Sequence, residues 1–485
     1  MRLDDLLLDL APAGTPLPEG KVRGLCYDSR KLSPGDLFVA IRGEHTDGHR
    51  YLAEAADKGA VAALVEEKTD ANLPQIVVGN TLAVLSTVAA RFYGHPSRHL
   101  TVVGVTGSNG KTTSCYLLES IGAATGESVG VLGTIEYRWA GQRKKAVHTT
   151  PMALELQQML AQMRKDGVQM VAMEASSHAL ALHRLDDVEF TGALFTNLSP
   201  EHLDFHKDMD NYGRTKLRLF TELLRPDGVA VVNGDDAWGR TIAEALPQRE
   251  CFVYGRKDAD LFPGPVKMSR EGLVFQFNAP DGSITLESRL LGTHNLYNIL
   301  GAAGMAWALG YPLEAIAEGV AALETVPGRL ERVDAGQDFL AVVDYAHTPD
   351  GLLQVLETLS GLPHKRIITV MGCGGDRDRT KRPKMGAIAL RLSQVTIVTS
   401  DNPRSEDPLA IIDEIVAGMS AGEKGKDYHV VPEREDAIRQ AVGLAEAGDI
   451  VLVAGKGHET TQTIGANVLP FDDREVLGRA LREAR

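Results

Sequence analysis

The residues that could do chemistry begin with a glycine-rich stretch from Val102 to Thr113, with the sequence VVGVTGSNGKTT. An apolar, β-branched run ends at this stretch, and we expect a helix to begin near Lys111. Gly107 and Gly110 allow positive φ and close approach to a polyphosphate, with amide N–H groups and the helix dipole facing the anion. Lys111 would reach the β- and γ-phosphates, and the Thr112 hydroxyl would hold Mg²⁺. The alternative is a strand-to-helix turn with a solvated lysine.

Two later apolar stretches also end in polar groups. The stretch from Val168 to Met173 predicts a strand that delivers Glu174 at its carboxyl end, where open parallel sheets place ligands. This carboxylate is either a Mg²⁺ ligand or an acid that caps a helix. A further strand is followed by His202, Asp204 and His206. Their spacing does not match a zinc template, so one histidine beside Mg²⁺ or phosphate is the more economical interpretation.

Four apolar strands after about residue 334 each end in a polar, glycine-bearing loop: FLAVVDYAH, RIITVMGCGGDRD, VTIVTSDNPR and DIVLVAGKGHE. Helical segments alternate with them, which predicts a doubly wound parallel sheet with the four loops along its carboxyl edge. An arginine binds a carboxylate bidentately and an acid binds an ammonium, so these loops suit a zwitterion. The groups concerned are Arg377, Asp401, Asn402, Arg404 and Glu459. NAD is disfavoured, because Arg377 stands where a dinucleotide fingerprint needs its third glycine.

Composition bounds the class of protein. The chain has 485 residues, too many for one core, and we expect three domains. A net charge of −14 argues against a nucleic-acid partner. The four cysteines lie far apart, which indicates neither a disulfide framework nor a zinc knuckle and fits a reducing compartment. The first residues lack a basic region and no apolar run approaches the ~18 residues of a membrane span, so a cytoplasmic protein is expected.

The elements that position these groups predict an α/β fold of three domains. Residues 1–98 form a small α/β domain with a strand at 36–41, a helix at 52–58 and two further short strands. Residues 99–332 form a central domain of the phosphate-loop ATPase type with a mostly parallel sheet. Residues 333–485 form a Rossmann-like domain. Within the central domain we expect helices at 153–165, 211–220 and 294–310 and an antiparallel hairpin around a Pro-Asp-Gly turn.

Several motifs carry a resemblance to a known family. TGSNGKTT closely resembles the nucleotide loop of the Mur ligases, ATP-dependent amide-forming enzymes of peptidoglycan synthesis. The segment DSRKLSPGDLFVA, residues 28–40, is similar to the one with which the MurE branch grips the uridine diphosphate of its substrate. The motifs SSH, HNLYN, DNPR and GKGHE follow in family order, so the resemblance covers nearly the whole chain.

The resemblance implies three groups of binding residues. Those for ATP are Gly107, Ser108, Asn109, Gly110, Lys111, Thr112, Thr113, Asn295 and Arg329. Those for the uridine-diphosphate substrate are Ser29, His45, Thr46, Thr149, Thr150, Ser176 and Arg184. Those for diaminopimelate are Arg377, Asp401, Asn402, Pro403, Arg404, Gly455 and Glu459, because the DNPR motif resembles the form that selects this amino acid. Leu182 departs from the glutamine of many relatives and is not included.

Catalytic roles are implied for Lys111, Glu174, His202 and Lys216, with Thr112, Glu174, His202 and Lys216 at the metal. Taken alone, Lys216 would be a solvated helix lysine. Mur ligases carry a lysine in this setting that is carbamylated by CO₂ to N6-carboxylysine. This modification is physically sensible, because an unmodified ammonium would repel Mg²⁺.

The implied activity joins meso-2,6-diaminopimelate to the D-glutamate of UDP-N-acetylmuramoyl-L-alanyl-D-glutamate through an acyl phosphate, with ATP and Mg²⁺. The partners are then small molecules, without nucleic acid or membrane insertion, and a monomer is expected. Two alternatives stay open: the same chemistry with L-lysine, and a ligase similar to folylpolyglutamate synthase. A plain ATPase or phosphotransferase would leave the amino-acid loops unexplained.

Overall fold

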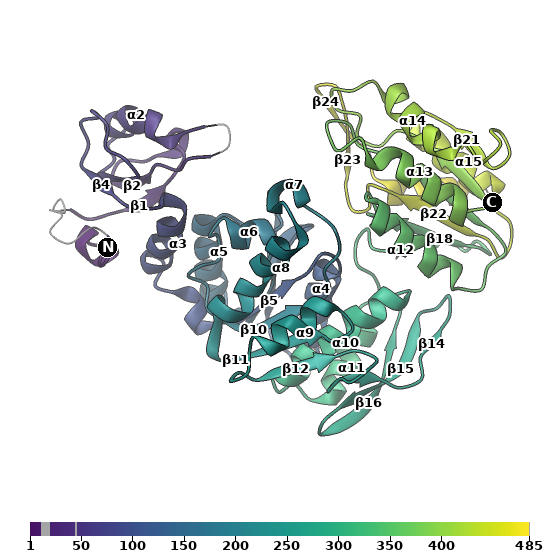
Figure 1. Ribbon diagram of the computed structural model, residues 1–485, viewed down its shortest axis with the longest axis horizontal. Coiled ribbons are helices and arrows are strands. Elements are labelled where there is room, and N and C mark those ends of the chain that lie inside the picture. The colour runs from purple at the N-terminus through teal and green to yellow at the C-terminus, as the bar shows by residue number, and fades with distance from the viewer. Residues whose placement is uncertain (11–19, 44–45, 485) are drawn as a thin grey trace. The chain divides into compact units, whose positions relative to one another are not determined.

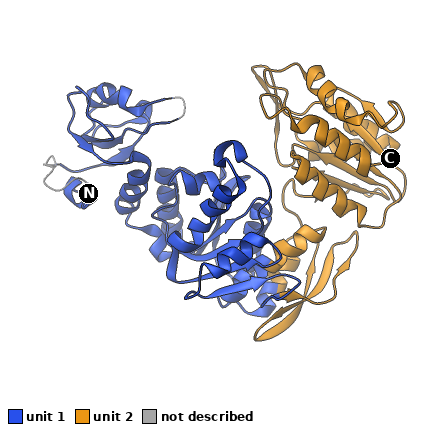
Figure 2. Ribbon diagram, in the orientation of Figure 1, with its two compact units in different colours: residues 1–261, 301–316 blue, residues 262–300, 317–485 orange. Residues whose placement is uncertain are grey.

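The computed structural model describes residues 1–10, 20–43 and 46–484. Its contacts separate two compact units (Figure 2): residues 1–261 with 301–316, and residues 262–300 with 317–485. Three parallel or mostly parallel sheets, each accompanied by helices, follow one another along the chain, which confirms the predicted three-domain α/β class. The predicted domain boundaries near residues 98 and 332 stay a prediction.

The first sheet has four parallel strands in the order β1-β2-β3-β4 (Figure 1). They are β1 (Gly24–Cys26), β2 (Asp36–Val39), β3 (Ala62–Val65) and β4 (Gln75–Val77). Apolar residues on β2 and β3 alternate between two buried clusters, one on each face of the sheet. Three helices accompany the sheet: α1 (Leu3–Leu6), α2 (Leu52–Asp57) and α3 (Thr81–Phe92). The strand and helix expected at 36–41 and 52–58 are therefore confirmed.

The central sheet has eight strands in the order β12-β11-β10-β5-β9-β6-β7-β8, and its neighbours pair in parallel except for the antiparallel pairs β6–β7 and β7–β8. The strands are β5 (Thr101–Thr106), β6 (Val129–Leu132), β7 (Glu136–Trp139), β8 (Gln142–Lys145), β9 (Met170–Glu174), β10 (Phe190–Phe195), β11 (Leu224–Asn233) and β12 (Cys251–Tyr254). β5 lies between β9 and β10, with Val105 opposite both Glu174 and Leu194. The carboxyl ends of three neighbouring strands therefore share one edge.

Helices connect the strands of the central sheet. They are α4 (Lys111–Ala124), α5 (Ala153–Lys165), α6 (Ser177–Ala181), α7 (Leu203–His206), α8 (Met209–Arg218) and α9 (Ala237–Glu244). α4 begins at the residue predicted, and α5 has the predicted bounds. α8 passes into a π-helical turn at Leu219–Leu223, so the helix predicted at 211–220 has a different regular structure at its end.

A small antiparallel sheet opens the second unit. It contains β13 (Phe262–Pro263), β14 (Lys267–Met268), β15 (Leu273–Ala279) and β16 (Gly282–Ser288). β15 and β16 pair on either side of the predicted turn, which confirms the hairpin. The predicted helix at 294–310 is α10 (Thr293–Ala308), and α11 (Leu313–Ala322) follows it.

The last sheet has the order β17-β18-β22-β19-β20-β21 and is parallel except for β17. Its strands are β17 (Glu331–Arg332), β18 (Leu340–Asp344), β19 (Ile367–Met371), β20 (Val395–Val398), β21 (Tyr428–Val430) and β22 (Ile450–Ala454). Apolar clusters cover both faces, one with helices α12 (Pro349–Ser360), α13 (Lys381–Leu392) and α14 (Pro408–Val416), the other with α15 (Arg434–Leu444) and α16 (Asp473–Glu483). The predicted doubly wound sheet is confirmed. A hairpin of β23 (Thr461–Ile464) and β24 (Asn467–Pro470) follows β22.

Across the described part of the chain, no helix combines the length and the apolar character needed to cross a membrane.

Candidate active site

The phosphate loop joins β5 to α4, as predicted. Gly107 and Gly110 have φ of +147° and +90°, which side-chain-bearing residues adopt rarely. A Cβ atom on Gly107 would lie 1.9 Å from Thr196 Oγ1, so a larger residue cannot occupy this position. Gly110 directly precedes α4, whose first-turn N–H groups have no partner within the helix and point toward the loop. This end of α4 is a ready anion site.

The segment after β10 holds this loop in place. The N–H of Ser108 donates to Asn197 O at 2.8 Å, and the N–H of Asn109 donates to Asn197 Oδ1 at 3.0 Å. Thr196 Oγ1 donates to Asn109 O at 2.6 Å. The expectation that these loop amides face the anion is therefore wrong for Ser108 and Asn109, because Asn197 occupies both donors. The N–H groups at the start of α4 remain as the donors that can bind a phosphate.

Two lysines converge beneath the loop. Lys111 Nζ donates to Gly107 O and Ser108 O at 2.8 and 2.6 Å. Lys216 Nζ, from α8, donates to Gly107 O at 3.0 Å and lies 4.4 Å from the ring centroid of Tyr212. Lys216 is only 1% exposed, so the alternative of a solvated helix lysine is wrong. Burial, reinforced by the charge of Lys111, holds the pKa of Lys216 well below its usual range.

Glu174 is the last residue of β9 and collects hydroxyl and amide donors. Its carboxylate accepts bonds from Thr112 Oγ1 at 2.9 Å, from Thr134 N at 2.8 Å and from Thr134 Oγ1 at 3.0 Å. The alternative role as a helix cap is wrong, because Ser176 caps α6. Thr134 was missed by the sequence reasoning. It follows β6 beside a glycine, at the same carboxyl edge, and that position was the available signal.

His202 stands at the start of α7 with φ of +57° and a half-exposed ring. Its ring packs edge-on against His178, with centroids 4.8 Å apart. Burial and the charges of Lys111 and Lys216 lower its pKa. Nothing among the described residues gathers three histidine, cysteine or acidic side chains into a metal-binding group. His206 instead contacts Ser177 Oγ at 2.9 Å through its ring nitrogen.

The predicted substrate residues of the central sheet lie together. Thr150 Oγ1 donates to Glu174 O at 2.6 Å and accepts from Ser176 N at 3.1 Å. Arg184 Nη1 donates to Thr150 O at 3.1 Å, and its Nε atom is buried without a partner. The hydroxyl of Thr149 lies 3.1 Å from the hydroxyl of Thr134. These contacts run continuously from Glu174 to the arginine.

The other predicted residues for this substrate come from the first sheet. Ser29 Oγ donates to Glu54 Oε2 at 2.9 Å, and Thr46 is exposed. His45 lies outside the described residues. Two positions before Ser29, the Tyr27 hydroxyl donates to Glu155 Oε1 of α5 at 2.7 Å, which ties this segment to the central sheet. No described hydrogen bond joins Ser29 or Thr46 to the group around Thr150.

In the second unit, the loops after β20 and β22 meet through a buried lysine. Lys456 Nζ donates to Asn402 Oδ1 and to Glu459 Oε2, both at 3.2 Å, and Asn402 Nδ2 donates to the same Glu459 oxygen at 2.8 Å. Lys456 was not predicted, although it stands within the GKGHE motif. Asp401 is 8% exposed, and its Oδ2 atom has no partner. Gly455 leaves room for that oxygen, since a Cβ there would approach it to 2.7 Å.

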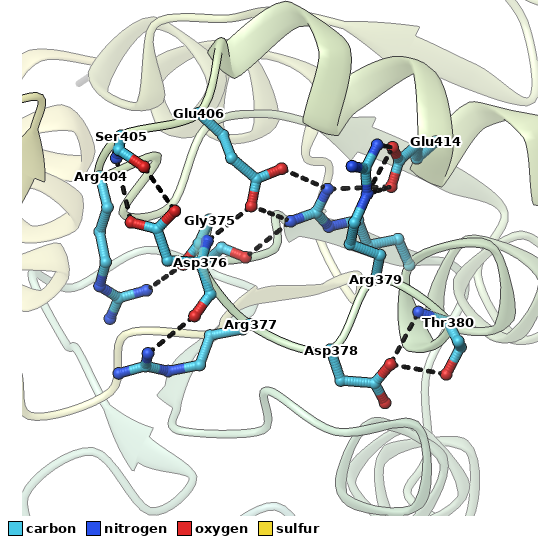
Figure 3. A network of polar contacts seen from close by, with 12 residues as sticks. Gly375, Asp376, Arg377, Asp378, Arg379, Thr380, Arg404, Ser405, Glu406 and Glu414 are labelled. Carbon is cyan, nitrogen blue, oxygen red and sulfur yellow. Dashed lines mark hydrogen bonds and ion pairs between the residues drawn. The ribbon is translucent and has the colours of Figure 1, made fainter. Parts of the chain in front are cut away.

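Arg404 follows Pro403 with a left-handed backbone, φ +52°. Its N–H donates to Thr463 O at 3.0 Å, and its carbonyl oxygen accepts from Gly465 N at 2.7 Å, so the β23–β24 hairpin holds its main chain. Its Nη1 atom donates to Gly375 O at 2.7 Å (Figure 3). Arg377, on the same glycine-rich loop, is exposed and donates to Asp376 O.

The two remaining predicted nucleotide residues also lie in the second unit. Asn295 is buried in α10, where its Nδ2 donates to Leu291 O at 2.8 Å and its Oδ1 accepts from Asn298 Nδ2 at 2.9 Å. The Arg329 guanidinium lies 4.9 Å from the ring centroid of Tyr345. No described contact joins the side chains of Asn295 and Arg329.

Comparison with known proteins agrees with this geometry along the whole chain. Three family models match: "Mur ligase family, catalytic domain" at residues 21–93, "Mur ligase middle domain" at 105–306, and "Mur ligase, glutamate ligase domain" at 328–457. The UDP-N-acetylmuramoyl-L-alanyl-D-glutamate--2,6-diaminopimelate ligase of Syntrophomonas wolfei is 44% identical over 95% of each chain.

The chain belongs to the Mur ligase family.

Further similarity supports this membership. The diaminopimelate ligase of Gloeobacter violaceus is 44% identical over 100% of this chain and 99% of its own. A solved structure of a UDP-N-acetylmuramoyl-L-alanyl-D-glutamate--2,6-diaminopimelate ligase superposes with a TM-score of 0.73 at 32% identity, covering 100% of this chain and 99% of the other. The central sheet with the phosphate loop therefore corresponds to the Mur ligase middle domain, and the last sheet to the glutamate ligase domain.

Proposed function

We propose that this Mur ligase joins meso-2,6-diaminopimelate to the γ-carboxylate of the D-glutamate in UDP-N-acetylmuramoyl-L-alanyl-D-glutamate, with cleavage of ATP to ADP and phosphate. It would act as a cytoplasmic monomer in peptidoglycan synthesis. The observation that carries the amino-acid assignment is the loop Asp401 to Arg404, where an unpartnered buried carboxylate oxygen lies three residues before an arginine. Such a loop suits a ligand that carries both an ammonium and a carboxylate.

The described residues fit ATP and Mg²⁺. The missing side chain of Gly107 lets the phosphate loop pack directly against Thr196, and the start of α4 offers amides that have no partner within the helix. Thr112 and Glu174 present a hydroxyl and a carboxylate that already contact each other, and oxygen donors of this kind suit Mg²⁺. Thr112, Glu174 and His202 would hold the ion, which supplies charge neutralisation on the phosphoryl oxygens when bound.

Lys216 would take part as N6-carboxylysine. Its amine is buried and lies against Gly107 O, so the charged form is costly at this place. A neutral amine is the form that reacts with CO₂, and the product would place an anion beside the phosphate loop. The buried setting is the physical support for this modification, which the family resemblance suggested.

The reaction follows from the chemistry of amide formation. An oxygen of the D-glutamate γ-carboxylate attacks the γ-phosphorus, the bond to the ADP oxygen breaks, and an acyl phosphate forms. The diaminopimelate amine then attacks the acyl carbon, phosphate leaves, and the amine gives up a proton. Lys111 compensates phosphoryl charge. Arg184, with its unpartnered Nε, would bind the uridine-diphosphate substrate together with Thr149, Thr150 and Ser176, while Ser29, His45 and Thr46 would serve its nucleotide end.

The second unit would supply the amino-acid site. Arg404 and Arg377 would bind the carboxylate of the distal centre, and Asp401 and Glu459 the ammonium, with Asn402 and Gly455 lining the loop. Pro403 helps to fix the turn, because its ring restricts φ. Asn295 and Arg329 would lie at the adenine and ribose of ATP.

The deciding experiment measures the mass of the product. The enzyme is incubated with the UDP-muramoyl dipeptide, ATP, Mg²⁺ and either meso-diaminopimelate or L-lysine. A new amide with diaminopimelate, with phosphate released in equal amount, is expected. Amide formation with L-lysine alone would move the assignment to the alternative amino acid. Phosphate release in the absence of an amino acid would indicate that the protein is only an ATPase.

A further inference from the structure

A fully buried arginine lies behind the amino-acid loops. Arg382, on α13, has no exposed side-chain surface. Its Nη1 donates to Glu406 Oε2 and Glu414 Oε2, both at 2.9 Å, and its Nη2 donates to Glu406 Oε1 at 2.8 Å. The same Nη2 lies 3.3 Å from Gly374 O, at the start of the glycine-rich loop. Figure 3 shows this network of polar contacts beside Arg404.

Glu406 connects this arginine to both loops. It stands two residues after Arg404, and its Oε1 atom also accepts the N–H of Asp376 at 2.6 Å. The Arg382 guanidinium holds the pKa of Glu406 low, at about 2, so its carboxylate stays charged at neutral pH. A charged acceptor shared between a buried guanidinium and a backbone amide fixes the spacing of the two loops.

Further bonds join the two loops directly. Gly375 N donates to Asn402 O at 2.9 Å, and Arg404 Nη1 donates back to Gly375 O. Ser405 Oγ donates to Asp376 Oδ1 at 2.6 Å. Asp376 has a left-handed φ of +55°, a conformation that needs such support in a residue other than glycine. The glycine-rich loop and the DNPR loop therefore form one cross-linked block, with the Arg404 guanidinium at its edge.

We infer that Arg382 and Glu406 are a positioning pair that sets the place of the Arg404 guanidinium, and that they determine selectivity for an amino acid with a distal carboxylate without touching it. This inference rests on the proposed function. The pair acts by holding the glycine-rich loop, whose Gly375 carbonyl holds Arg404. A displacement of about 1 Å at such a site can cost about 10²-fold in rate.

The test replaces Glu406 by glutamine, which keeps its shape and removes its charge. We expect kcat/KM for meso-diaminopimelate to fall about 10- to 100-fold, mainly through KM, while KM for ATP changes less than about twofold. Arg379→Ala is the matched control. Arg379 pairs with Glu414 at the exposed side of the same network and has no described bond to either loop, so wild-type kinetics are expected.

A double-mutant cycle separates positioning from general stability. If Glu406 acts through Arg404, Glu406→Gln has less than about a twofold further effect in an Arg404→Ala background. Additive losses, or wild-type diaminopimelate kinetics in Glu406→Gln, would overturn the inference. Should that variant fail to fold, Glu406→Asp keeps the charge but shortens the side chain that reaches Arg382 and the N–H of Asp376, and an unchanged KM for diaminopimelate would overturn the inference equally. Failure of the proposed function looks different, because the wild type would not use diaminopimelate.

Discussion

The Nζ atoms of Lys111 and Lys216 donate to the same carbonyl oxygen, that of Gly107, at 2.8 and 3.0 Å. Two ammonium groups that bond to one oxygen repel each other, and Lys216 is the buried one. The cost of charge therefore falls on Lys216. Lys216 is therefore the lysine of the pair that is suited to become a neutral amine that can be modified.

Lys216→Ala should be nearly inactive and partly rescued by a short carboxylate such as acetate, because the modified lysine is proposed to act as an anion. The measurement is kcat with and without acetate, together with the intact mass of the wild-type protein in bicarbonate buffer. Lys216→Arg serves as a control that keeps a cation and should not be rescued. An unmodified amine in the wild type, with normal activity in Lys216→Ala, would contradict this role.

Lys111→Ala should lower turnover by about 10² or more while leaving the fold intact, because it removes charge compensation at the phosphates and no buried apolar surface. The measurement is phosphate release that depends on both substrates, alongside the circular dichroism spectrum. Near-normal ligase activity would end the phosphate-loop argument. Lys144→Ala, a lysine of the exposed β8 strand, is a matched control for the loss of one positive charge.

Thr134→Val should weaken the apparent affinity for Mg²⁺ by about 10- to 100-fold, the usual effect of losing a group that orients a metal ligand. The Thr134 hydroxyl donates to Glu174 Oε2, and valine keeps the shape without the donor. The activity is titrated with Mg²⁺ at saturating ATP. Thr134→Ser keeps the hydroxyl and should stay close to the wild type; equal Mg²⁺ dependence of all three proteins would argue against Glu174 as a ligand.

Arg404→Ala should reduce kcat/KM for meso-diaminopimelate by about 10² or more, with little change in ATP binding, since a charge-assisted pair to the distal carboxylate is lost. Arg404→Lys should recover little, because the planar fork is gone. Steady-state kinetics with meso-diaminopimelate and L-lysine check both statements. Comparable kcat/KM for the two amino acids in the wild-type protein would refute this specificity assignment.

Acidification should destabilise the second unit between about pH 6.5 and about pH 4. Burial, together with the charge of Arg329, lowers the pKa of both His294 and His458 to about 4. The unfolded chain has histidine pKa values near 6.5, so it binds more protons than the folded chain in this window, and stability is lost as pH falls. Melting temperatures across the window measure the effect. His294→Gln should flatten the dependence, and a melting temperature that is independent of pH would contradict it.

The fold was predictable because its patterns are local. The apolar strands, the glycine-rich turns after them and the amphipathic helices are read from neighbouring residues, and α4 begins at Lys111 as expected. The order of the strands in each sheet does not follow from these local patterns. β5 lies between β9 and β10, and only this arrangement brings Asn197 to the amides of Ser108 and Asn109.

The site residues that belong to a recognised motif were predicted. The residues that contact them from another strand or loop were missed. Thr112 and Glu174 were both expected, and they are in contact. Thr134 and Lys456 were missed. The place of Thr134 after β6 and of Lys456 in the GKGHE motif indicated the right edge of each sheet, but not that the side chains contact Glu174 and Asn402. Such partners are specified by three-dimensional packing, and a single sequence carries no record of it.

The hydrogen bonds between the β23–β24 hairpin and the main chain of Arg404 affect how this position can evolve. Thr463 and Gly465 bond to backbone atoms that every residue except proline has, so these two bonds do not depend on the side chain at this position. A left-handed arginine costs roughly 1–2 kcal/mol relative to glycine, comparable with the roughly 1.5–3 kcal/mol of its charged bond to Gly375. Exchange of Arg404 for glycine, which removes both the left-handed strain and the charged bond, is therefore nearly neutral for folding. If Arg404 has the proposed role, a single codon change at this position alters the amino-acid preference without a compensating mutation elsewhere.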